Sequence, residues 1–267
     1  MSHPLLERLE SPDPGERFDA CRSAAHDPAA VILLDALEEA LGDPVVAVAR
    51  AASDALAEIG SRTPEVDALL RRALRGDRPN ARWGAAFASA RLAPPGPGLL
   101  PPLVEALACE APDVRWQAAR LLVESGRVLP ELQPLLAGLV SGDARPLVRQ
   151  MAAHCLRELA PDEPETAQIL LEATRDRDPR VRRASLSALA ALGETPPAVA
   201  ERLLEVSAVD ADAASRCIAV DVLGAIAARQ PGALSTEAEV ALRRIATRAE
   251  DGNLRGAAAR ALRRLAT

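Results

Sequence analysis

Four aromatic side chains and a set of arginines are the residues whose types and spacing suit the binding of another molecule. The aromatic residues are Phe18, Trp83, Phe87 and Trp116, and the 267-residue sequence contains no other Phe, Tyr or Trp. Trp83 and Phe87 are four residues apart, which places them next to each other on one face of a helix. Exposed aromatic side chains beside arginine are typical of binding hot spots, so these residues predict a binding surface.

The aromatic residues lie within a segment that recurs along the chain. When the copies are aligned on Val181, the steps between them are 32 to 34 residues, and the last step is 39. The next position is arginine in seven of the eight copies and Ala49 in the other. A period this steady indicates an internal repeat. The aligned residues are Glu16, Val48, Ala81, Val114, Val148, Val181, Ser215 and Leu254.

Each copy has the pattern of a helix. In the clearest copy, Asp178 and Pro179 suit a helix start and Gly193 suits a helix end. The apolar residues between them follow the spacing of one helical face. A second apolar helix precedes each copy, as in residues 31–41 and 132–140. Hydrophobic residues make up 49% of the chain but aromatic residues only 1%, so small side chains fill the core, which favours closely packed helices over strands.

The repeated unit resembles a HEAT repeat, in particular the short type that is also found in bilin lyases. Its pattern, Asp-Pro-x-Val-Arg followed by alanines and leucines up to a glycine, is best matched by residues 178–193 and 48–60, and residues 148–160 are close to it. The resemblance covers about residues 3–266. It implies an all-α, right-handed α-solenoid of about eight helical hairpins, which we expect to form one domain, residues 1–267.

Aspartate and arginine near the start of each repeated helix predict a ladder of ion pairs. Asp178 and Arg182 are four residues apart and can pair on one helix. Related aspartates precede most of the other copies, so stacked repeats would bring these pairs into a row that links repeat to repeat. We interpret this ladder as structural.

Helical geometry predicts an outward stripe on each repeated helix. The positions two, five, six and nine residues after the aligned residue lie opposite the apolar face. All four aromatic residues occur on this stripe, with seven arginines and only two acidic residues, Asp54 and Asp221. The resemblance to HEAT arrays places the stripe on a concave surface, so we expect a basic, aromatic groove centred on the third to fifth repeats. The predicted partner-binding residues are Phe18, Arg50, Trp83, Phe87, Trp116, Arg120, Gln150, His154, Arg157 and Arg183.

Such a groove favours a non-enzymatic scaffold or adaptor that binds another protein or peptide, with an acidic segment and apolar anchors as the expected ligand. DNA binding is an alternative, because the groove is similar to that of HEAT-like alkylpurine DNA glycosylases, which use Trp, Arg and a catalytic Asp. However, Phe87 and Arg120 follow Trp83 and Trp116 by four residues, where that family places an Asp beside a Trp. A bilin lyase-like activity is a further alternative, which the repeat type alone suggests.

Histidine and cysteine usage predicts neither a metal site nor a cofactor. The chain has three histidines, and its four cysteines are scattered without a CxxC pair. We expect free thiols in a reducing compartment, and therefore a cytoplasmic protein, most simply a monomer. Residues 1–10 lack the features of a signal peptide, and no apolar run reaches the roughly 18 residues that indicate a membrane span.

Overall fold

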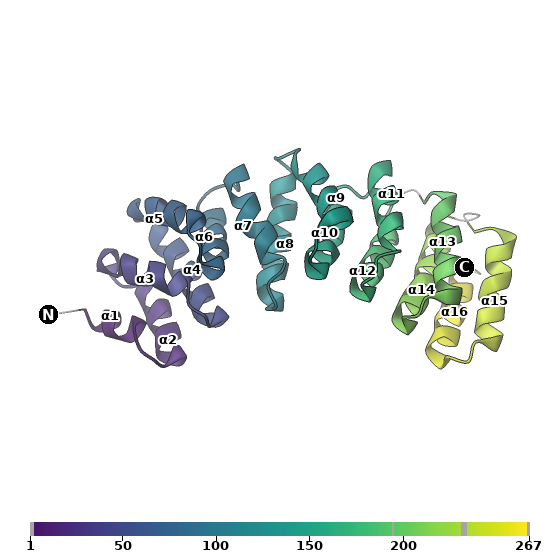
Figure 1. Cartoon of the computed structure of the whole chain (residues 1–267), viewed down its shortest axis with the longest axis horizontal. Helices are drawn as coiled ribbons and strands as arrows, with labels where there is room; N and C mark the ends of the chain where they lie inside the picture. The colour runs from purple at the N-terminus through teal and green to yellow at the C-terminus, as the bar shows by residue number, and fades with distance from the viewer. Residues whose placement is uncertain (1–2, 194, 231–233, 266–267) are drawn as a thin grey trace. The chain divides into compact units, whose positions relative to one another are not determined.

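The computed structural model describes residues 3–193, 195–230 and 234–265. Within these residues the chain forms sixteen α-helices and no strand (Figure 1). The helices follow one another as eight hairpins, so the chain is an all-α solenoid, as the repeat predicted. Contacts divide the chain into two compact units, Met1–Leu129 and Pro130–Thr267, which are described separately below as unit 1 and unit 2.

Unit 1 contains four hairpins, and the second helix of each carries the aligned repeat position. Short 3-10 turns, Ala30–Leu33 and Pro97–Leu99, lead into the first helices of the second and fourth hairpins. The eight helices are α1 (Pro4–Leu9), α2 (Pro14–Ala24), α3 (Leu34–Leu41), α4 (Val46–Gly60), α5 (Glu65–Arg75), α6 (Pro79–Leu92), α7 (Leu100–Ala106) and α8 (Pro112–Gly126).

Unit 2 contains the other four hairpins. In both units the second helices pack side by side. In unit 1, α2 packs on α4 and α4 on α6; in unit 2, α10 packs on α12, α12 on α14 and α14 on α16. The eight helices of unit 2 are α9 (Leu132–Gly142), α10 (Pro146–Leu159), α11 (Pro164–Ala173), α12 (Pro179–Leu189), α13 (Pro197–Val209), α14 (Ala213–Arg229), α15 (Thr236–Arg248) and α16 (Gly252–Leu265).

Local sequence explains where the second helices begin. The Asp178 carboxylate accepts a hydrogen bond of 2.8 Å from the Arg180 amide, and Pro179 is the first residue of α12. Asp13 caps α2 in the same way, through a bond of 2.9 Å from the Gly15 amide. The predicted end of α12 at Gly193 is wrong, because the helix ends at Leu189 and a turn follows it directly.

The aligned repeat positions lie in the hairpin cores, except Glu16 of the first hairpin, which is exposed. Val48, Val114, Val148 and Val181 are fully buried, which confirms the predicted apolar face of these helices. Among the described residues, no helix is both long and apolar enough to cross a membrane.

At several steps the arginine after the aligned residue joins its hairpin to the following one. Arg149 of α10 directs its Nε and Nη2 atoms to the two carboxylate oxygens of Asp176, at 2.6 and 2.8 Å, and its Nη1 atom donates to the Asp143 carbonyl. Arg182 binds Asp210 in the same two-pronged way, at 2.9 and 2.8 Å. In each pair, the carboxylate belongs to the following hairpin. The predicted structural ladder is therefore present at these steps.

The pairing within the ladder differs from the prediction. Arg182 does not pair with Asp178 on its own helix; Asp178 instead binds Arg180, at 2.9 Å between Oδ2 and Nη2. Asp178 is engaged at the start of its own helix by the Arg180 amide and guanidinium, whereas Asp210 offers Arg182 two carboxylate oxygens at once. Arg182 also donates to the Asp176 carbonyl of the preceding loop at 3.0 Å.

Candidate functional site

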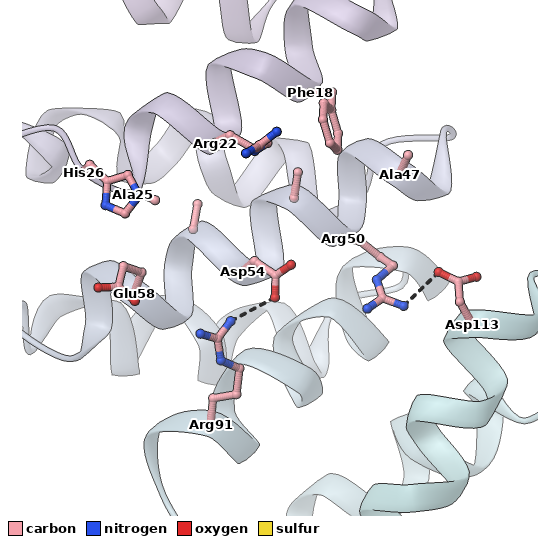
Figure 2. A pocket seen from close by; sticks show the side chains of 12 residues that line it. Phe18, Arg22, Ala25, His26, Ala47, Arg50, Asp54, Glu58, Arg91 and Asp113 are labelled. Carbon is pink, nitrogen blue, oxygen red and sulfur yellow. Dashed lines mark hydrogen bonds and ion pairs between the residues drawn. The ribbon is translucent and has the colours of Figure 1, made fainter.

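A pocket of about 630 Å³ opens between α2 and α4 in unit 1 (Figure 2). It lies on the second-helix side of the hairpins, which is the side that carries the predicted stripe. Two predicted site residues, Phe18 of α2 and Arg50 of α4, line it. The whole lining is Phe18, Arg22, Ala25, His26, Ala47, Arg50, Ala51, Asp54, Ala55, Glu58, Arg91 and Asp113.

The floor of the pocket is a row of small side chains on α4. Ala47, Ala51 and Ala55 follow one another at intervals of four residues, so they lie along one face of the helix. Alanine at these positions leaves space between α2 and α4 that a larger side chain would fill. The floor therefore offers apolar surface without hydrogen-bonding side chains.

Two ion pairs fix four of the charged side chains of the pocket. Arg50 lies 2.8 Å from Asp113 of α8, and Arg91 of α6 lies 2.9 Å from Asp54 (Figure 2). Each pair joins two different helices, so both charges are held in place and locally balanced.

Arg22 is bound differently from the other two arginines. Its guanidinium carbon lies 5.9 Å from the centre of the Phe18 ring, one turn earlier on α2, in a cation–π arrangement. Among the described residues, no carboxylate lies within ion-pair distance of Arg22, and the side chain is exposed. The pocket therefore contains one guanidinium whose charge no neighbouring acid balances.

The predicted exposure of Trp83 and Phe87 is wrong. Both side chains are only 3% exposed, and their ring centres lie 5.2 Å apart. Trp83 Nε1 donates to Asn80 Oδ1 at 3.1 Å, and Asn80 Nδ2 donates to the Asp43 carbonyl at 2.7 Å. The Asp43 carbonyl lies six residues before Ala49. In other repeats the arginine at the position of Ala49, such as Arg149, binds the carbonyl six residues before it. Asn80, held by Trp83, thus replaces the arginine that Ala49 lacks.

The predicted residues of α8 remain at the surface of unit 1. Trp116 is 48% exposed and lies one turn after Asp113, which lines the pocket. Arg120 is exposed and lies 3.9 Å from Glu124. These two side chains extend the candidate surface beyond the pocket along the same helix.

The remaining predicted residues lie in unit 2, on α10 and α12. Arg157 lies 3.2 Å from the ring of His154, and burial lowers the pKa of this histidine, with a smaller contribution from the charge of Arg157. Arg183 lies 3.7 Å from Asp212. Gln150 is half-buried on α10.

Ion pairs balance much of the charge that was predicted to make the stripe basic. Arg50 and Arg120 have acidic neighbours in unit 1, as do Arg157, Arg183 and Arg260 in unit 2. Counting arginines against acids on the stripe therefore gives a larger positive charge than a ligand would meet there.

Cysteine chemistry does not contribute to this site. All four thiols are free, and burial raises the pKa of Cys21 and of Cys155 to about 12, so both stay protonated. Within the described residues, no group of three or more His, Cys, Asp or Glu side chains is arranged to hold a metal ion.

Comparison with known proteins agrees with the observed stack of hairpins. Residues 100–190 and 132–224 match the family model for HEAT repeats. Residues 100–224 are therefore HEAT repeats. No curated protein matches its sequence significantly.

Several solved structures are similar to this chain. Kap95p is 15% identical, with a TM-score of 0.62 over 98% of this chain and 38% of its own, and importin beta is 15% identical, with a TM-score of 0.61 over 98% and 40%. YIBA_ECOLI is 17% identical, with a TM-score of 0.60 over 98% and 91%. The chain thus spans about two fifths of Kap95p and of importin beta. At these identities the likeness establishes the fold alone.

The pocket includes residues that the stripe did not single out. Ala51 and Ala55 fall on the predicted apolar face, three and seven residues after Val48, and Ala47 precedes Val48, so the stripe omits all three. Arg91 and Asp113 come from hairpins further along the chain, so only the packing of the hairpins brings them to the pocket.

Proposed function

We propose that this protein is a non-enzymatic scaffold that binds a segment of another protein along the second-helix face of unit 1. The observation that carries this proposal is the pocket between α2 and α4, which combines an apolar floor, a partly buried ring and an unbalanced guanidinium. Pockets with apolar walls and a few placed polar groups are the usual form of a ligand site. The exposed Trp116 on α8 supplies an additional apolar anchor near the pocket.

The fold supports the same proposal in a general way. HEAT arrays offer extended surfaces that suit protein ligands, and Kap95p, whose fold is similar, binds RanGDP. Free cysteine thiols fit a reducing compartment, so we place the scaffold in the cytoplasm as part of the proposal.

Two observations favour a protein ligand over DNA. Trp83 and Phe87 are buried, which removes two of the four rings on which bases could stack. The acids of the stripe, Asp54 and Asp221, are both paired with arginine, at 2.9 Å in each case, rather than available as a catalytic base.

The test is affinity purification from an extract of the source organism, with bound proteins quantified by mass spectrometry. The variant Ala47→Arg/Trp116→Ala fills the pocket with a long side chain and removes the exposed ring. Val31→Arg/Ile32→Ala makes the matched changes at two exposed residues before α3. We expect the first variant to lose a partner that the second retains. Retention of every partner by the first variant would contradict the proposal.

A further inference from the structure

The charged side chains of the pocket differ in how much of their charge is available to a ligand. Arg50 forms an ion pair with Asp113, and Arg91 forms one with Asp54. Arg22 is exposed and, within the described part of the chain, has no acidic partner within 4.0 Å. A guanidinium offers parallel N–H donors that match the two oxygens of a carboxylate. The ring of Phe18 supports the guanidinium of Arg22 from one side and leaves its donors free.

The pair between Arg91 and Asp54 keeps Arg22 available. Arg22 and Asp54 each follow the aligned residue of their repeat by six positions, so they stand at the same level on the neighbouring helices α2 and α4. Figure 2 places both in the middle of the pocket. Asp54 is therefore the acid best placed to neutralise Arg22, but Arg91 holds it at 2.9 Å.

Three kinds of surface follow one another along the pocket (Figure 2). Phe18 and Ala47 form an apolar end, Arg22 lies in the middle, and His26 and Glu58 form the other end. Phe18 and Arg22 are four residues apart on α2, which is about 6 Å along a helix, and His26 follows in the turn after α2. Two residues of an extended peptide span about the same distance.

We infer that the pocket binds an extended peptide segment in which an aliphatic, an acidic and a basic side chain occupy every second position. In an extended chain such side chains point to one side, so all three would face the pocket. The aliphatic side chain lies on Ala47 beside Phe18, the carboxylate binds Arg22, and the basic group lies near Glu58. This inference rests on the proposed scaffold function and specifies the ligand of its site.

The direct test uses synthetic peptides and the full-length protein. Acetylated, amidated, fluorescein-labelled heptapeptides carry Leu, Glu and Arg at the second, fourth and sixth positions, in both orders, among Ser and Gly. Matched peptides carry Gln in place of Glu. Fluorescence anisotropy should give at least a roughly 10-fold lower Kd for one Glu peptide than for its Gln counterpart, as expected for a charge-assisted pair.

Three variants test the roles of the individual side chains. Arg22→Gln should abolish the preference for Glu. Arg91→Ala should weaken binding of the Glu peptide several-fold because it releases Asp54 to pair with Arg22, and Arg91→Ala/Asp54→Ala should restore it. Circular dichroism confirms that each variant is folded before its affinity is compared.

Several results would overturn the inference. These are equal affinity for the Glu and Gln peptides, binding of neither at millimolar concentration, or a Glu preference that survives Arg22→Gln. Binding of a thymidine 12-mer that depends on Arg22, with no peptide binding, would assign the pocket to nucleic acid instead. A natural partner lost by Ala47→Arg/Trp116→Ala but retained by Arg22→Gln would refute this ligand and leave the scaffold proposal intact.

Discussion

Trp83 and Trp116 occupy equivalent positions in successive repeats but differ in exposure, at 3% and 48%. The difference comes from the neighbouring hairpin rather than from the tryptophans. Ala49 leaves a loop carbonyl without its usual arginine, and Asn80 binds that carbonyl while it accepts a hydrogen bond from Trp83. Trp83 is therefore part of the joint between two hairpins, whereas about half of Trp116 is exposed.

Alanine substitutions should separate these two roles. Trp83→Ala should lower the free energy of unfolding by about 3–5 kcal/mol, as expected for loss of a large buried side chain. Trp116→Ala should change it by no more than about 0.5 kcal/mol, as is usual at exposed sites. Urea denaturation followed by circular dichroism measures both. Equal losses in the two variants would contradict the assignment of Trp116 to the surface.

The ladder aspartates make stability depend on pH. The hydrogen bond from Arg180 lowers the pKa of Asp178 to about 2. Burial raises the pKa of Asp210, but the hydrogen bonds from Arg182 and the Asp212 amide and the charges of Arg182 and Arg202 together lower it by more, so the net pKa is below the ordinary value. A lowered pKa in the folded protein gives stability that is complete above the unfolded pKa of about 4 and is lost as pH falls through the folded pKa.

We therefore expect the free energy of unfolding to fall steeply between about pH 4 and pH 2. Asp178→Asn should make this fall shallower, because one proton fewer is taken up on unfolding. Asp19→Asn, at an exposed position on α2, is the control and should leave the slope unchanged. Urea titrations at a series of pH values measure the slope, and an unchanged slope in Asp178→Asn would count against the role of this carboxylate.

At the scale of helices, α14 and α16 show how small residues set the spacing of the stack. A Cβ atom on Gly224 would lie 2.6 Å from the Ala261 Cα atom, which is too close for any side chain. Glycine is required here because the helix backbones approach each other, not because of a special backbone angle. A Cβ atom on Gly256 of α16 would instead meet only Arg260 Nη1, at 3.6 Å.

Replacing each glycine by alanine should have opposite effects. Gly224→Ala should destabilise unit 2 by about 1–3 kcal/mol, because the added methyl group overpacks the joint. Gly256→Ala should stabilise it by up to about 1 kcal/mol through better helix propensity. Hydrogen exchange of the amides in α16 reports both changes. Faster exchange in Gly256→Ala, or no change in Gly224→Ala, would argue against this packing.

The sequence predicted the eight hairpins because the spacing of apolar residues indicates helices. It predicted the ladder because aspartate and arginine recur at the same positions in successive repeats. It did not predict the burial of Trp83, because a helical wheel treats one helix alone and omits the neighbouring helices on either side. The pocket was missed for a related reason. It depends on alanines that create space and on Arg91 and Asp113, which arrive from other hairpins.

In both units, many arginines link one hairpin to another. All 32 basic residues are arginine, and the ladder needs its forked side chain, which binds a carboxylate and a carbonyl at once. Because many guanidinium groups have acidic neighbours, we propose that recognition depends on those without one. Arg22, in the pocket of unit 1, is the one that our account selects.

The central claim, that partners bind the second-helix face of unit 1, is tested most directly by site-specific photo-crosslinking. A benzophenone amino acid is placed at Ala47, on the pocket floor, or at Ala68, an exposed alanine of the first helix α5. The two sites match in residue type and exposure but lie on different helices of the hairpins. Our account predicts a crosslinked partner from Ala47 and none from Ala68, whereas a partner crosslinked from Ala68 but not from Ala47 would contradict it.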